Sequence, residues 1–184
     1  MMRDAAMAQQ RYSRGAIAFH WTIGLLVIVN LAIGIGHDAL EGWPVMPIHK
    51  AIGITVLFLS VARLAWRLTH RPPPLPPMPG WQVGVAHLTH WLFYVFMIAI
   101  PFSGWWFSSA AKTPRPISWF GLFDVPLLPV ERATAIAGAM HEAHELMGFA
   151  MIALILLHVG AALKHHLIDR DATLVRMAPV LRQR

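Results

Sequence analysis

The chain contains no cysteine among its 184 residues. This absence excludes disulfide bonds, cysteine-ligated iron–sulfur clusters and haem attached through thioether links. Charged residues are scarce as well, at 13% of the chain against 57% hydrophobic residues. Together with a mean hydropathy of +0.53, this balance is typical of an integral membrane protein rather than a soluble domain. The side chains that stand out are eleven histidines.

The formal net charge is +6. A basic chain can indicate nucleic-acid binding, but in a membrane protein Lys and Arg gather on the cytoplasmic side. We therefore expect membrane lipid as a partner and no nucleic acid.

Four apolar segments, at about 18–37, 48–69, 82–108 and 141–168, are long enough to cross a membrane as helices, which takes about 20 residues. They predict one all-α transmembrane domain over 1–184, an integral membrane four-helix bundle that runs up, down, up and down. A proline-rich hinge (70–80) joins the second and third segments, and a longer loop (109–140) joins the third and fourth.

In such a bundle the Lys and Arg residues divide eleven to four between the two sides, which predicts that both termini are cytoplasmic. The eleven on the side of the termini are Arg3, Arg11, Arg14, Arg63, Arg67, Arg71, Lys164, Arg170, Arg176, Arg182 and Arg184.

Four histidines fall at two depths of the predicted bundle. His20 and His158 lie near the cytoplasmic side, and His49 and His144 lie near the other side. His144 and His158 are fourteen residues apart, about 21 Å along a helix and within about 40° of one face. Two pairs at two depths are what two bis-histidine haems, bound without covalent links, would need. A zinc or copper site would instead want three or four donors at one depth.

Each of these histidines is followed one turn later by a small residue. The four are Gly24, Gly53, Gly148 and Ala162. A flat macrocycle beside its ligand needs such space, although small residues also serve ordinary helix packing in membranes.

Arg63 and Arg67 follow His49 by fourteen and eighteen residues, so all three share one helix face. If His49 points inward, the two arginines lie at the level of the inner haem, where a propionate could accept paired hydrogen bonds. The alternative is that they extend to lipid headgroups.

Six stretches of the chain, in order, resemble the bacterial cytochrome b561 family of small di-haem membrane cytochromes. They are "YSRGAIAFHW" (12–21), "IHKAIGI" (48–54), "ARLAWRL" (62–68), "GVAHLTH" (84–90), "HELMG" (144–148) and "LLHVGAALKHH" (156–166).

The resemblance implies that His20, His49, His144 and His158 are the axial ligands of two b-type haems in a bacterial inner-membrane oxidoreductase. It also implies electron exchange with ubiquinone and, as in the best-defined branch of the family, superoxide as the periplasmic donor. The charges of the outer segments nearly cancel, so superoxide depends on the resemblance alone.

Candidate quinone-site residues are the polar groups near the inner haem: Ser13, Arg14, His87, His90 and His165. His165 follows His158 by two helical turns and shares its face. Each of the five can also be an interfacial residue that faces headgroups.

Two other functions stay open. The chain can be an electron-transfer subunit that docks a separate dehydrogenase, or a haem-free transporter of metal or protons. A monomer is sufficient for either haem hypothesis, because one four-helix bundle can enclose both haems.

Overall fold

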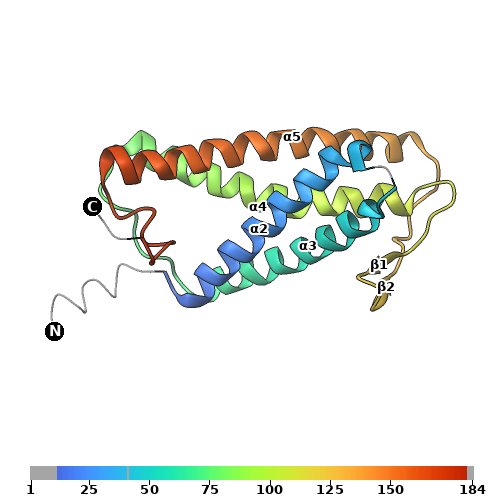
Figure 1. The fold of residues 1–184 in the computed structure, drawn as a ribbon, viewed down its shortest axis with the longest axis horizontal. Coiled ribbons are helices and arrows are strands. Elements are labelled where there is room, and N and C mark those ends of the chain that lie inside the picture. Colours follow the sequence, from blue (N-terminus) through green and yellow to red (C-terminus); the bar gives the residue numbers. More distant parts are fainter. Residues whose placement is uncertain (1–11, 41, 182–184) are drawn as a thin grey trace.

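The computed structural model describes residues 12–40 and 42–181, and within them four long helices form one bundle (Figure 1). They are α2 (Arg14–Gly36), α3 (Val45–Thr69), α4 (Gly80–Ser109) and α5 (Ala135–Lys164). All four are long and apolar enough to span a membrane. The predicted all-α four-helix fold is confirmed. Four of the eleven arginines and lysines that predicted its orientation, Arg3, Arg11, Arg182 and Arg184, lie outside the described residues.

Local signals explain where the helices begin. Ser13 caps α2 by accepting a hydrogen bond from the backbone N–H of Ala16 at 3.2 Å, and Thr134 caps α5 in the same way through Ala137. Such caps satisfy backbone donors that the first turn of a helix leaves free. Because of the Thr134 cap, α5 begins six residues before the expected position 141.

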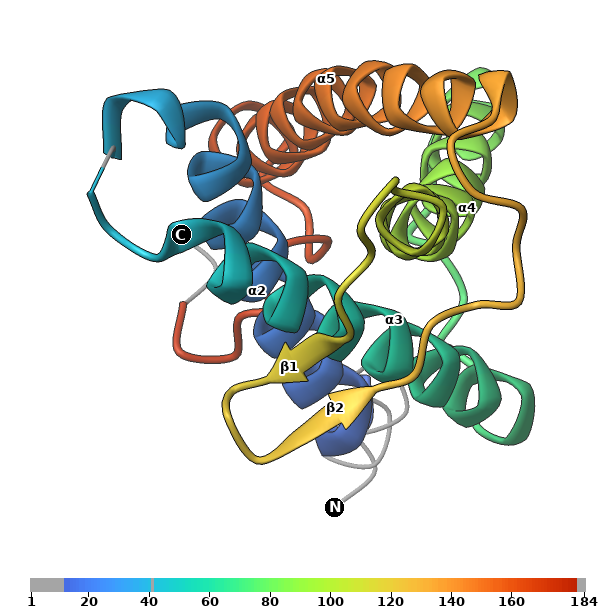
Figure 2. The same cartoon turned by 90° about the vertical axis from the view of Figure 1, so that its right-hand side faces the viewer.

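Consecutive helices pack side by side and run in opposite directions (Figure 1), and the view from the hairpin end shows them inclined to one another (Figure 2). Ile23, Met97 and Met151 form a buried cluster that joins α2, α4 and α5. Large apolar side chains elsewhere face outward, such as Leu25 at 64% exposure. Lipid can cover such side chains, so the exposed apolar surface agrees with a membrane-spanning bundle.

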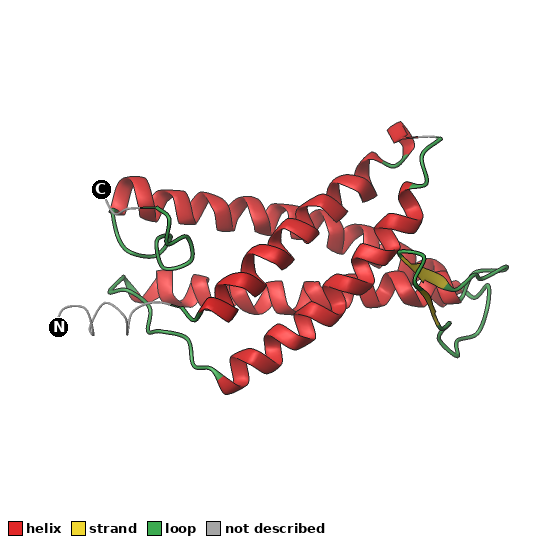
Figure 3. Cartoon of the chain, turned by 60° about the horizontal axis from the view of Figure 1, so that its bottom comes forward, coloured by secondary structure: helices red, strands yellow, loops and turns green. Residues whose placement is uncertain are grey.

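The segment expected to be a loop over 109–140 holds the only strands in the described part of the chain (Figure 3). β1 (Ile117–Trp119) pairs antiparallel with β2 (Phe123–Val125). Three-residue strands next to proline and glycine carry too little periodicity to be recognised in a sequence. The remaining short elements are a 3₁₀ turn, η1 (Asp38–Leu40), and a π-helical turn, η2 (His165–Asp169).

The described chain begins and ends at the same end of the bundle (Figure 1). There the C-terminal segment (170–181) folds back on the helices. The indole N–H of Trp21 donates to the carbonyl of Met177 at 2.7 Å, and Arg176 donates to the carbonyl of Pro74 at 2.6 Å. We call this the inner end and the hairpin end the outer end, after the predicted orientation.

Candidate functional site

The outer pair, His49 of α3 and His144 of α5, meets at the outer end of the bundle. The ring centres are 6.0 Å apart and the rings are inclined by 77°. Both rings line a cavity of about 640 Å³ to which all four helices contribute residues. Cavities of this size hold small organic molecules and cofactors in other proteins.

Backbone carbonyls of neighbouring helices fix both rings of the outer pair. Nδ1 of His49 lies 3.1 Å from the carbonyl of Asn30 in α2, and Nδ1 of His144 lies 2.8 Å from the carbonyl of Ile100 in α4. A carbonyl only accepts hydrogen bonds, so Nδ1 is the nitrogen that carries hydrogen in each ring. Nε2 then keeps its lone pair, which is the usual state of a histidine that binds a metal.

Two glycines let these rings approach the helix backbones. A Cβ added at Gly34 would lie 3.0 Å from Cε1 of His49, and one added at Gly104 would lie 3.0 Å from Cε1 of His144. Each glycine follows the accepting carbonyl by four residues. Sequence reasoning missed both, although a glycine inside a helix is costly enough to suggest a packing reason.

Two of the three glycines that the sequence did single out leave open space, whereas a Cβ added at Gly53 would lie 3.7 Å from the side chain of Asn30. A Cβ added at Gly24 or Gly148 would meet no atom within 4 Å. Gly53 and Gly148 also line the cavity beside the outer pair. Open space one turn after the ligand is therefore present beside His144, at Gly148, but not around Gly53.

The inner pair, His20 of α2 and His158 of α5, has ring centres 6.2 Å apart. A third ring, His90 of α4, lies 5.6 Å from His158. Nδ1 of His90 is already 2.8 Å from the carbonyl of Ala86 in its own helix. Within 12–40 and 42–181, no carbonyl of a neighbouring helix accepts from either ring of the inner pair, unlike the outer pair.

The two arginines of α3 reach toward the inner pair. A terminal nitrogen of Arg63 lies 3.5 Å from Nδ1 of His20. The guanidinium groups of Arg63 and Arg67 are both 5.7 Å from the ring centre of Tyr94 in α4. A cation over an aromatic face is attracted by the ring. Positive charge is thus concentrated at the inner pair.

Ser13 and Arg14 line a second cavity at the inner end, about 790 Å³ in volume, together with His70 and Arg71. The hydroxyl of Ser13 also accepts a hydrogen bond from the Trp66 indole at 3.3 Å. His87 is exposed. The structure therefore separates the quinone-site candidates rather than bringing all five together.

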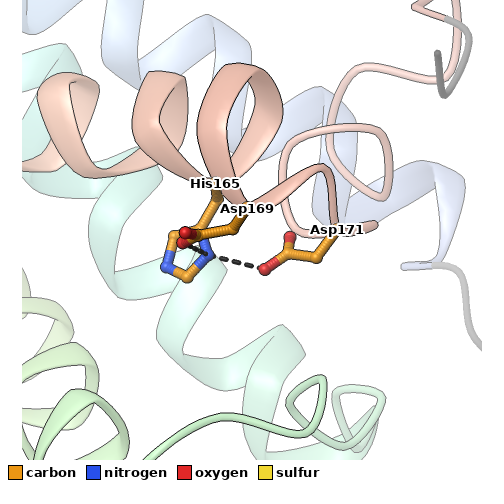
Figure 4. A group of neighbouring side chains, drawn as sticks. All are labelled: His165, Asp169 and Asp171. Carbon is orange, nitrogen blue, oxygen red and sulfur yellow. Dashed lines mark hydrogen bonds and ion pairs between the residues drawn. The ribbon is translucent and has the colours of Figure 1, made fainter.

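His165 lies in η2 between two carboxylates (Figure 4). Its Nδ1 is 2.6 Å from Asp171 and 3.3 Å from Asp169, and Asp169 also pairs with Lys164 at 2.6 Å. Burial raises the pKa of Asp171, but hydrogen bonds from Thr173 and His165 outweigh it and hold this pKa below its ordinary value. His165 is thus tied to the C-terminal segment, a contact that the sequence did not indicate.

Comparison with known proteins gives one consistent result. Residues 11–179 match the family model described as prokaryotic cytochrome b561. The chain is 36% identical to cytochrome b561 homolog 2 of Escherichia coli (strain K12), over 91% of each chain. It is 34% identical to the probable superoxide oxidase CybB of Yersinia pestis, over 92% of this chain and 97% of the relative. It is 31% identical to cytochrome b561 homolog 1 of Escherichia coli (strain K12), with the same coverage.

Proposed function

The chain belongs to the prokaryotic cytochrome b561 family, and we propose that it is a di-haem membrane oxidoreductase that carries single electrons from superoxide to ubiquinone. The family consists of membrane electron-transfer proteins with b-type haem. The proposal adds the number of haems, the residues that hold them, the donor and the acceptor.

The outer pair would hold one haem and the inner pair the other. This proposal rests on the two pairs of facing imidazoles, with ring centres 6.0 and 6.2 Å apart. A metal–imidazole bond is about 2 Å long, so a metal shared by two imidazoles separates their ring centres by roughly 6 Å. When bound, each haem supplies a one-electron couple without a free coordination position for oxygen.

The protein's own groups orient the ligands before any haem binds. The carbonyls of Asn30 and Ile100 hold Nδ1 of His49 and His144, so Nε2 of each ring is the free nitrogen. At the inner pair, Arg63 and Arg67 supply positive charge suited to haem propionates. Arg63, which is half-buried beside His20, is the better placed of the two.

Superoxide is supported as the donor by the 34% identity to a probable superoxide oxidase. Lys50 lines the cavity of the outer pair and offers a positive charge to an anion. Each superoxide would give up one electron and leave as dioxygen. Two such events, together with two protons from the inner side, reduce one ubiquinone to ubiquinol.

We propose that ubiquinone binds at the inner end, beside His90. This half-buried imidazole lies 5.6 Å from His158, so it can exchange a proton next to the inner pair. Ser13, Arg14, His87 and His165 stay the other candidates. The proposed location is the bacterial inner membrane, with the inner end on the cytoplasmic side.

Reduction and reoxidation can be followed separately in the purified protein. A superoxide-generating enzyme should reduce the haems, and added ubiquinone should reoxidise them with ubiquinol as the product. His90→Ala should slow reoxidation by ubiquinone and leave the rate of reduction by superoxide unchanged. His166→Ala, at the same end of the bundle, is the control and should change neither rate.

Failure of superoxide to reduce the haems would refute it as the donor. If electrons then entered only from a co-purifying periplasmic dehydrogenase, the chain would be a docking subunit instead. Equal reoxidation rates in wild type and His90→Ala would refute the proposed quinone site.

A further inference from the structure

The hairpin between α4 and α5 presents an apolar tip (120–123), which consists of Phe120, Gly121, Leu122 and Phe123. Phe120 is 51%, Leu122 74% and Phe123 56% exposed. No charged residue occurs between Arg115 and Asp124. Neither the haem sites nor the bundle core uses these three side chains.

The hairpin is fixed to the side of α3 rather than to its end (Figure 2). The indole N–H of Trp119 donates to the hydroxyl of Thr55 at 3.0 Å. Ile54 of α3 packs against Ile117 and Val125 of the hairpin, and Trp119 packs against this cluster. Thr55 is ten residues inside α3, about 15 Å along the helix axis from Val45. The hairpin therefore lies against the side of α3, in the half of the helix nearer the outer end.

The turn at the tip has a conformation that its sequence does not favour. Phe120 has a φ of +51° and Gly121 a φ of +76°, and the N–H of Leu122 donates to the carbonyl of Trp119 at 3.0 Å. Turns in which both central residues have a positive φ prefer Asn-Gly or Asp-Gly at these positions. Phenylalanine is strained there. Its ring contacts Trp119, with the ring centres 5.3 Å apart, but half of the side chain stays exposed.

The hairpin has one polar face and an apolar tip. Ser118 and Asp124 are directly opposite each other in the ladder and both are exposed. Because side chains alternate along a strand, they point away from Ile117 and Val125, which pack against α3. A two-stranded sheet also has unpaired backbone edges, which the hydrocarbon core does not tolerate but the headgroup region does.

We propose that the tip is an interfacial anchor whose side chains insert among the phospholipid chains of the outer leaflet. Lipid is the occupant because the hairpin is attached beside an exposed apolar face of α3, where Ile48 and Phe58 share the side of Thr55. Aromatic residues are the usual anchors at this level. The anchor fixes the depth of α3 and hence of His49.

The absence of cysteine allows a direct test, since one introduced cysteine gives one labelled site. Leu122→Cys and the matched control Ser118→Cys would each carry a small fluorophore in the full-length protein. Both would be placed in phosphatidylcholine–phosphatidylglycerol nanodiscs that leave both membrane faces accessible. Circular dichroism would show that each variant keeps its helices.

We expect spin-labelled lipid to quench the label at position 122 several-fold more than the label at 118, and iodide in water to show the opposite preference. Stronger quenching of position 122 by iodide would overturn the proposal, because the tip would lie in water. Protection of position 122 from both quenchers would also overturn it, because protein would then cover the tip.

Discussion

Replacing Gly104 by alanine tests whether the ring of His144 must lie against the backbone of α4. The added methyl carbon would be 3.0 Å from Cε1 and 3.2 Å from Nδ1 of that ring, where ordinary contacts begin at 3.4 Å. The ring would have to retreat by a few tenths of an ångström. That movement weakens the hydrogen bond to the Ile100 carbonyl, which is 2.8 Å long.

The cost follows from this geometry. Loss of a neutral hydrogen bond costs about 1 kcal/mol, which is roughly a fivefold weaker binding constant. The helix itself should not suffer, because alanine favours a helix by about 1 kcal/mol over glycine. We therefore expect Gly104→Ala to bind its outer haem roughly fivefold more weakly while the haem-free protein stays as stable as the wild type.

Haem titration of the haem-free protein in detergent, followed in the Soret band, measures this change. Gly138→Ala in α5 is the matched control, because its methyl group would meet no atom within 4 Å. It should bind both haems like the wild type. Unchanged affinity in Gly104→Ala would refute the role given to the close approach of His144.

Three further outcomes are expected. Arg63→Gln should lower the midpoint potential of the inner haem by tens of millivolts, because a nearby positive charge stabilises the reduced state. Potentiometric titration measures this potential, and an equal potential in Arg63→Gln and the control Arg71→Gln would contradict the prediction. The pKa of Asp171 is depressed in the folded protein, so the stabilisation from its ionised carboxylate is present above the unfolded-state pKa near 3.9 and is lost as pH falls through the lower folded-state pKa. Hydrogen exchange of the C-terminal segment should rise over that fall in pH. An Asp171→Asn variant should lack this pH step. Trp119→Phe should lower the free energy of unfolding by about 1 kcal/mol, because it removes the hydrogen bond to Thr55. Thermal melting should show the same destabilisation in Thr55→Val, and the double variant should be no less stable than either single variant.

The four helices could be predicted because their apolar segments are long and continuous. The facing histidines could be predicted because regular helical spacing places residues such as His144 and His158 on one face. Distances of 6.0 and 6.2 Å between ring centres show that the predicted partners do meet.

What could not be predicted depends on contacts between helices. The carbonyls of Asn30 and Ile100 accept from histidines that are 19 and 44 residues away in the chain, and carbonyls carry no residue-specific signal. The carboxylates around His165 were hidden for the same reason. His90 was predicted near the inner haem, but its direct contact with the ring of His158 was not. Helical spacing places a residue on a face but does not identify what lies opposite.

The number of haems per chain tests the central claim most directly. A dithionite-reduced minus air-oxidised spectrum of the purified protein, with haem and protein quantified, should show a b-type alpha band and two haems per chain, one for each histidine pair. One haem per chain would contradict the two-pair assignment. A colourless protein that takes up no added haem would contradict the assignment of all four histidines.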